Sequence, residues 1–231
     1  MKKIGMIGGL SWVSTAAYYR LINEIMQKKL GGVSSAHLLL ESINREEYID
    51  AAEKRGDDRT ACDIVLKAAQ SVERGSAAFI VMACNGAHRF VPEIELQIEI
   101  PFLHIADTTA LAIKAANISS VAILGMRQTM EGQFYPEALE RHGIATIVPE
   151  EAEKSFIHDS ILSELVRNIF LDTTRARYVE IIRDLHARGA EGVILGCTEI
   201  PLLVSENDVD VPIFSTTDIH CRAAVEMALT H

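Results

Sequence analysis

Short apolar runs alternate along the chain with longer segments in which apolar residues recur at helical spacing. The short runs are rich in Val, Ile and Leu and hardly alternate with polar residues, which is typical of strands covered on both faces. Strands are predicted at Lys3–Ile7, His37–Leu40, Phe79–Ala83, Phe102–Ile105, Ser120–Leu124, Ala145–Val148, Gly192–Leu195 and Ile213–Ser215. Helices are predicted at Ser14–Lys29, Thr60–Arg74, Thr108–Ala116, Met130–His142, Lys154–Phe170, Thr173–Arg188 and Thr217–Leu229. This alternation predicts an α/β fold with parallel sheets.

The pattern occurs twice. Ile4–Gly9 and Val121–Met126 are apolar runs that lead into glycine, and Phe79–Asn85 and Gly192–Thr198 are apolar runs that lead into cysteine and a small polar residue. The repeat predicts two pseudo-symmetric lobes, each with a parallel sheet flanked by helices. We place the first lobe at residues 1–101 plus 208–231 and the second at residues 102–207.

Cys84 and Cys197 each follow a predicted strand, one in each lobe. Open parallel sheets bind ligands beyond the carboxyl ends of their strands, so we expect an active site in the cleft between the lobes. One thiolate could remove the proton of a bound α-carbon while the other thiol donates a proton from the opposite side. A single cysteine at such a position is more often a packing residue, but the matched pair favours catalysis. Cys62 and Cys221 lie within helical patterns and are interpreted as packing residues.

Composition and charge exclude several classes of function. Hydrophobic residues make up 48% of the 231 residues, which is enough for a sizeable core. No apolar run reaches the roughly 18 residues that cross a bilayer, so we expect no membrane partner and a cytoplasmic location. The net charge of −10 and the lack of a basic patch argue against a nucleic-acid partner. None of the four cysteines forms a CxxC pair, which argues against a zinc knuckle or a thioredoxin motif.

The motifs around the two cysteines resemble those of the aspartate/glutamate racemase family. The most specific segments are Cys84-Asn85-Gly86-Ala87-His88 and Gly196-Cys197-Thr198-Glu199. The resemblance extends through Ile7–Thr15, Leu103–Asp107 and Leu124–Met130 and covers essentially the whole chain. It implies a racemase that uses neither pyridoxal phosphate (PLP) nor a metal, acts on a small amino-acid substrate and forms a homodimer. We therefore expect no cofactor.

The resemblance also assigns roles to residues. Cys84 and Cys197 would be the two acid/base residues, and His88 would support Cys84 by lowering its pKa or capping the site. A structural role for His88 is the alternative, and Glu199 could orient either a substrate ammonium group or the neighbouring helix. The expected substrate-binding residues are Gly9, Leu10, Ser11, Asn85, Gly86, Thr129, Phe156, Thr198 and Glu199.

Three positions depart from the family pattern. Gly86 and Met126 each stand where the family usually has threonine, and Phe156 falls where a lysine recognises the distal carboxylate of aspartate. Lys154 or Arg45 could replace that lysine. Because a buried unpaired carboxylate is costly, we expect a substrate other than aspartate or glutamate, or weak activity on those two.

Other interpretations stay open at this point. A zinc site at Cys84 and His88 would need two further ligands. The segment Gly5–Gly9 is not the GxGxxG of dinucleotide-binding proteins. Asp107 and Asp218 are interpreted as helix-capping residues, and Trp12 as a packing residue or a part of the cleft wall.

Rival functions are another isomerase or a decarboxylase of the Asp/Glu/hydantoin racemase superfamily, or a non-catalytic amino-acid-binding relative. Two intact cysteines favour racemisation over chemistry that needs one.

Overall fold

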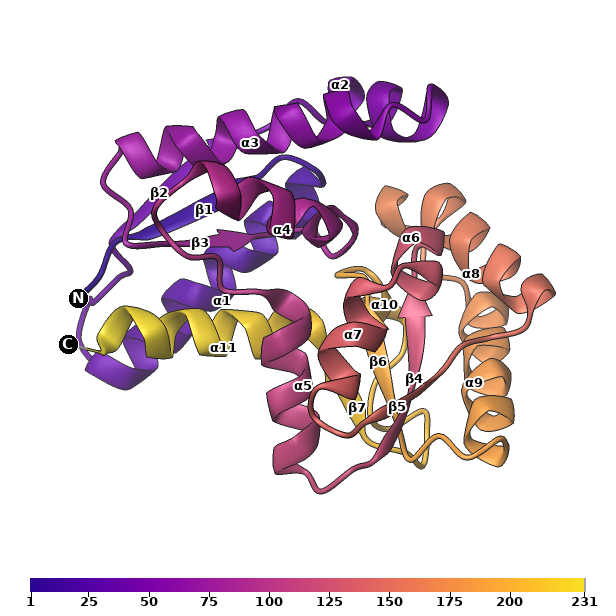
Figure 1. The fold of residues 1–231 in the computed structure, drawn as a ribbon. Coiled ribbons are helices and arrows are strands. Elements are labelled where there is room, and N and C mark those ends of the chain that lie inside the picture. Colours follow the sequence, from indigo (N-terminus) through magenta and orange to yellow (C-terminus); the bar gives the residue numbers. More distant parts are fainter. Residues whose placement is uncertain (231) are drawn as a thin grey trace. The chain divides into compact units, whose positions relative to one another are not determined.

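The computed structural model describes residues 1–230, which form two compact units. One unit comprises Met1–Ile105 and the C-terminal residues from His220, and the other comprises Ala106–Ile219. Each contains one parallel sheet with helices around it, which confirms the expected α/β class (Figure 1). The expected lobes differ from these units at residues 102–105, where Phe102 forms a bridge with Ile80 of the first sheet, and at residues 208–219, because the strand at Ile213–Ser215 pairs within the second sheet.

The first sheet has the strand order β2-β1-β3, with all strands parallel. Its strands are β1 (Ile4–Gly8), β2 (Leu38–Ser42) and β3 (Phe79–Met82). Its helices are α1 (Trp12–Leu30), α2 (Arg45–Ile49), the π-helix η1 (Asp50–Lys54), α3 (Asp58–Arg74), the 3-10 helix η2 (Gly86–Phe90), α4 (Val91–Ile94) and the 3-10 helix η3 (Glu95–Gln97). Ser11 begins α1 because its side chain accepts a hydrogen bond from the Ser14 amide at 3.3 Å.

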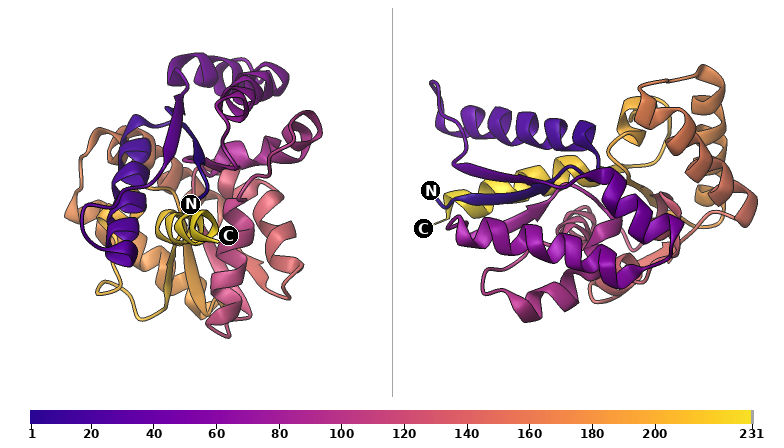
Figure 2. Two further views of the ribbon diagram at one scale, coloured as in Figure 1. Left: turned by 90° about the vertical axis from the view of Figure 1, so that its left-hand side faces the viewer. Right: turned by 90° about the horizontal axis from the view of Figure 1, so that it is seen from above.

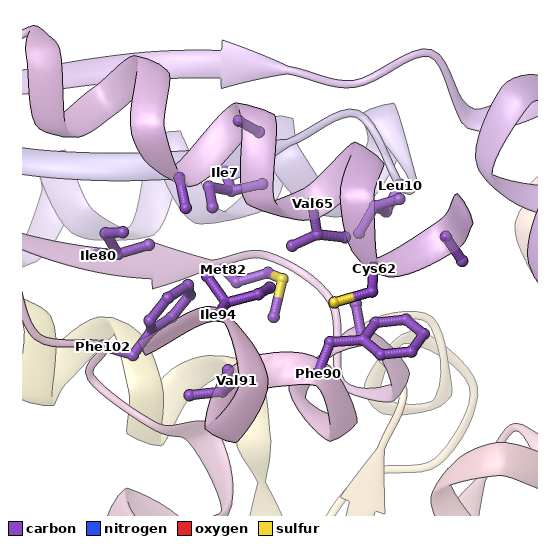
Figure 3. Close-up of a cluster of buried hydrophobic side chains, with 14 of the residues drawn as sticks. Ile7, Leu10, Cys62, Val65, Ile80, Met82, Phe90, Val91, Ile94 and Phe102 are labelled. Carbon is purple, nitrogen blue, oxygen red and sulfur yellow. The ribbon is translucent and has the colours of Figure 1, made fainter. Parts of the chain in front are cut away.

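Both faces of the first sheet are buried, as the apolar runs predict. Ile80 and Met82 point into a cluster that also holds Ile7 and residues of α3 and α4 (Figure 3). The alternate residues Phe79 and Val81 point into a second cluster with α1 and the C-terminal helix, on the opposite side of the sheet from α3 (Figure 2). The two clusters contain Cys62 and Cys221 respectively, in agreement with their interpretation as packing residues.

The second sheet has the order β5-β4-β6-β7 and is also parallel throughout. Its strands are β4 (Ser120–Gly125), β5 (Ala145–Ile147), β6 (Gly192–Gly196) and β7 (Ile213–Ser215). The remaining helices are α5 (Ile105–Ala115), α6 (Arg127–Glu131), α7 (Phe134–Glu140), α8 (Glu151–Ser163), the 3-10 helix η4 (Leu165–Arg167), α9 (Asp172–Ala187), α10 (Ile200–Leu203) and α11 (Thr216–Leu229).

Several predicted elements are corrected by the structure. The predicted strand at Phe102–Ile105 is reduced to a single bridge between Ile80 and Phe102, because α5 begins at Ile105. The predicted helix at Met130–His142 is two helices, since Gly132 adopts extended backbone (φ −71°, ψ 152°) between α6 and α7. Trp12 is 75% exposed at the start of α1, so its interpretation as a packing residue is wrong.

Candidate functional site

The loop after β1 lies at the carboxyl edge of the first sheet and is closely packed. Gly9 has a positive φ of 85°, and a Cβ there would lie 2.0 Å from the carbonyl oxygen of Ile43, so only glycine fits. The Gly9 amide donates to Thr15 Oγ1 at 2.8 Å, which fixes the loop against α1. The Leu10 side chain is buried in the core, so what Leu10 can offer a ligand is its backbone.

Cys84 follows β3 at the same edge of the first sheet and is half-buried. Asn85 next to it is buried, and Gly86 begins the 3-10 helix η2. The buried His88 ring lies one turn further, with Nδ1 2.7 Å from the carbonyl oxygen of Cys84. His88 therefore contacts the backbone of Cys84, and burial holds the His88 pKa well below its usual value, so the ring is neutral at pH 7.

Tyr48 on α2 belongs to this region and was not predicted from the sequence. Its side chain is buried, and burial first and the neighbouring Cys84 charge second raise its pKa above the usual range. The Tyr48 hydroxyl is therefore protonated at any pH at which the protein would act. The signal in the sequence was its place shortly after β2, at the strand end that neighbours Gly9.

Cys197 occupies the matching place after β6 in the second sheet. Its thiol donates a hydrogen bond to Glu199 Oε2 at 2.9 Å, and Thr198 Oγ1 donates to the same oxygen at 2.7 Å. Glu199 is only 3% exposed, so this carboxylate is held in a largely dry environment beside the thiol. The contact gives Cys197 an adjacent proton acceptor on its own loop.

Thr129 lies against two paired strand ends of the second sheet. Gly125 and Gly196 are register partners, and a Cβ on Gly196 would lie 2.8 Å from Thr129 Cγ2. The Thr129 hydroxyl is buried and has no hydrogen-bond partner, which is costly unless a ligand or water supplies one. The Thr217 hydroxyl, after β7, is also buried without a hydrogen-bond partner, and it was not predicted from the sequence.

Three partly buried residues of the second unit share one hydrophobic environment. Met126, Phe156 and Cys197 all pack against the hydrophobic core of the second unit. The Phe156 ring meets the buried ring of Tyr178 edge-on at 6.0 Å between centroids. Burial raises the pKa of Tyr178 above its usual range, and the charge of Cys197 adds to this effect while the hydrogen bond with Ser160 opposes it, so this hydroxyl is neutral as well.

The nearby cations are already paired with carboxylates. Lys154 Nζ lies 3.6 Å from Glu131, and the Arg127 guanidinium lies 2.8 Å from both Glu131 and Glu151. In the first unit, Arg45 Nε is buried with no hydrogen-bond partner. Of the two cations expected to replace the family lysine, Lys154 is therefore engaged by Glu131, whereas Arg45 retains an unused donor.

Residues 1–230 lack both a membrane-spanning helix and a metal-site cluster. None of their helices is both long and apolar enough to cross a bilayer. No group of three or more His, Cys, Asp or Glu side chains among them has the arrangement of a metal site, so Cys84 and His88 do not form part of such a group.

The model of one protein family, Asp/Glu/Hydantoin racemase, matches residues 7–224. The chain belongs to this family. It is 42% identical to a Yersinia pestis protein assigned as an Asp/Glu racemase, over the full length of both chains and with a TM-score of 0.93. An aspartate racemase homologue from Pyrococcus horikoshii OT3 is 33% identical, again over both full chains, with a TM-score of 0.87.

A further relative extends the comparison to a protein named by its activity. The broad specificity amino-acid racemase RacX of Bacillus subtilis (strain 168) is 20% identical over 231 residues, which cover 99% of each chain. Family membership and these relatives together show that this protein is of the amino-acid racemase type. Racemases of this type act on amino acids.

Proposed function

We propose that this protein is a PLP-independent amino-acid racemase in which Cys84 and Cys197 are the two acid/base residues. The observation that carries the proposal is the matched position of the two thiols, each at the carboxyl end of the corresponding strand of a parallel sheet. The proposal requires both thiols to reach opposite faces of the same α-carbon.

In one direction, the Cys84 thiolate takes the α-proton and becomes a thiol, which leaves a carbanion whose charge spreads onto the substrate carboxylate. The Cys197 thiol then donates its proton to the opposite face of the carbon and becomes a thiolate. Its hydrogen bond to Glu199 supports this order, because the thiol is the donor in that contact. In the reverse direction Cys197 starts as the thiolate and takes the α-proton, and Cys84 starts as the thiol and donates one. To reach that state, Cys197 passes its proton to Glu199 Oε2, 2.9 Å away, which releases it to solvent, and Cys84 takes a proton from solvent.

The developing charge on the carboxylate needs hydrogen-bond donors that are already in place. We assign this role to Thr129, whose buried hydroxyl has no partner in the protein, together with Asn85. Thr198 can join them only by redirecting its hydroxyl, which donates to Glu199 Oε2 at 2.7 Å. The backbone of Gly9 to Ser11 lies at a strand end, where amides can bind an anion. Gly86 lacks the hydroxyl that a threonine usually provides at this position in the family.

We further propose that the substrate side chain is neutral. Phe156 and Met126 share the hydrophobic environment of Cys197, and Lys154 is paired with Glu131. An acidic side chain beside Phe156 and Met126 would lose hydration without gaining an ion pair with Lys154. The RacX relative is named for a broad specificity, which agrees with an enzyme that accepts more than one amino acid.

The test is a panel of single L- and D-amino acids, each followed by chiral chromatography. Cys84→Ala and Cys197→Ala should each abolish racemisation, whereas Cys62→Ala, a buried cysteine of the core, should retain it. Aspartate as the best substrate by a wide margin would contradict the neutral side chain. Unchanged racemisation in either active-site variant would contradict the two-cysteine mechanism, and no racemisation at all would favour a different reaction or a binding protein. The homodimer and the cytoplasmic location stay predictions.

A further inference from the structure

Three histidines and a tyrosine lie together within the first unit, and we call them the histidine cluster: His88, His104, His220 and Tyr18. The His88 ring meets His104 at 4.9 Å and His220 at 5.7 Å between centroids. His220 meets Tyr18 edge-on at 5.7 Å. His88, His220 and Tyr18 are fully buried, and His104 is half-buried, so most of the cluster's polar atoms lie inside the core.

Hydrogen bonds fix where the protons of this cluster lie. The Leu103 carbonyl, 2.8 Å from His220 Nε2, can only accept, so Nε2 carries the hydrogen and Nδ1 accepts from the Tyr18 hydroxyl at 3.0 Å. The same argument places a hydrogen on His88 Nδ1, which donates to the Cys84 carbonyl at 2.7 Å. Because burial keeps both rings neutral, His88 Nε2 is a bare acceptor, and it has no hydrogen-bond partner.

This arrangement excludes the charge effect that His88 was expected to have on the thiol. A neutral ring that donates to the carbonyl offers no positive charge to a thiolate. An unpartnered acceptor in the core also destabilises a fold, so a residue needed only for packing here would be better as an apolar side chain. What the ring does supply is a hydrogen bond that holds one peptide group, that of Cys84.

We propose that His88 is a positioning residue for Cys84, which sets the direction of the thiol by holding the Cys84 carbonyl. A second hydrogen bond holds the turn from Cys84 to His88, since the His88 amide donates to the Asn85 carbonyl at 3.1 Å. The surrounding rings of His104 and His220 keep His88 from rotating away. A shift of about 1 Å in a reacting group can cost on the order of 100-fold in rate. The inference rests on the proposed function, in which Cys84 is an acid/base residue.

The experiment compares His88→Asn with His88→Leu in the full-length protein. Asparagine places its amide nitrogen close to the position of Nδ1 and keeps the donor, whereas leucine fills similar space without one. His186→Leu is the matched control, because His186 Nδ1 makes the same 2.7 Å contact with a carbonyl, that of Ala190, in the other unit. Racemisation rates are measured together with the rate at which iodoacetamide alkylates Cys84, followed by mass spectrometry of its peptide across pH.

We expect His88→Leu to lower kcat by on the order of 10- to 100-fold with little change in KM, and to shift the pH profile of Cys84 alkylation. His88→Asn should restore most of both, and His186→Leu should change neither. Wild-type kcat and an unchanged alkylation profile in His88→Leu would overturn the proposal, as would equal losses in His88→Asn and His88→Leu.

Two further arms keep the result interpretable. If His88→Leu fails to fold, His88→Gln takes its place, because its amide lies beyond the Nδ1 position and should behave as a loss of the donor. If the wild-type protein racemises none of the amino acids, the proposed function fails, but the alkylation profile still tests whether His88 positions Cys84.

Discussion

Acid should destabilise this protein through the histidine cluster before its carboxylates are protonated. Burial lowers the pKa of His220 from 6.5 to about 4, and that of His88 in the same direction. The unfolded chain therefore binds a proton at each site below pH 6.5 that the folded chain does not. The corresponding stability is fully present above pH 6.5 and is lost as the pH falls toward 4.

The magnitude for His220 follows from the shift of its pKa. A change from 6.5 to about 4 makes the free energy of unfolding fall by about 2.5 kcal/mol between pH 7 and pH 4.5. His88 adds to this loss. Such a loss is a large share of the roughly 5–15 kcal/mol that stabilises an ordinary domain.

Urea unfolding at pH 7.0, 5.5 and 4.5 measures the effect, with His220→Gln as the comparison. Glutamine keeps a donor for the Leu103 carbonyl but does not titrate, so its stability should depend less on pH by about 2.5 kcal/mol over this interval. The variant should be less stable at pH 7, because the Tyr18 hydroxyl loses its acceptor. Equal pH dependence in the wild type and His220→Gln would refute the reasoning.

Three further outcomes are expected. Glu199→Gln should lower kcat on the order of 100-fold in steady-state assays, since the amide cannot accept the Cys197 proton. Phe156→Lys should raise kcat/KM for aspartate about tenfold, because it adds the cation that the family usually has at this position. An unchanged kcat/KM would contradict the proposal that the substrate side chain is neutral. Gly9→Ala should lower the free energy of unfolding by about 2 kcal/mol more than Gly143→Ala does. Gly143 shares the positive φ, but a Cβ there would meet nothing within 4 Å. Equal losses of unfolding free energy, measured with urea, would contradict the clash between a Cβ on residue 9 and Ile43.

The strands were predictable because parallel strands buried on both faces leave uninterrupted apolar runs. Seven of them lie at or within a few residues of the predicted positions. The strand predicted at Phe102–Ile105 was wrong, because an apolar segment can equally lead into a helix, and α5 begins at Ile105. The short helices α2, α4 and α10 were missed because four or five residues are too few to show a helical period.

Within the candidate site, the repeat was enough to select Cys84 and Cys197 from four cysteines. The place of Tyr48 shortly after β2 was not enough to select it, and Thr217 was not selected either, because the importance of both residues comes from burial that only the tertiary structure creates. The role of His88 changed for the same reason. Its spacing from Cys84 is compatible with a contact to the thiol, but the turn directs the ring to the carbonyl.

The central claim is that two different thiols handle the α-proton, and the most direct measurement is solvent deuterium in the early reaction. One enantiomer of a good substrate is converted in D₂O, and both enantiomers are analysed by mass spectrometry before much product has formed. The account predicts deuterium at the α-carbon of nearly all product and little in the remaining substrate, because the proton is removed by one cysteine and supplied by the other. Product that retains the substrate's own α-hydrogen would contradict it.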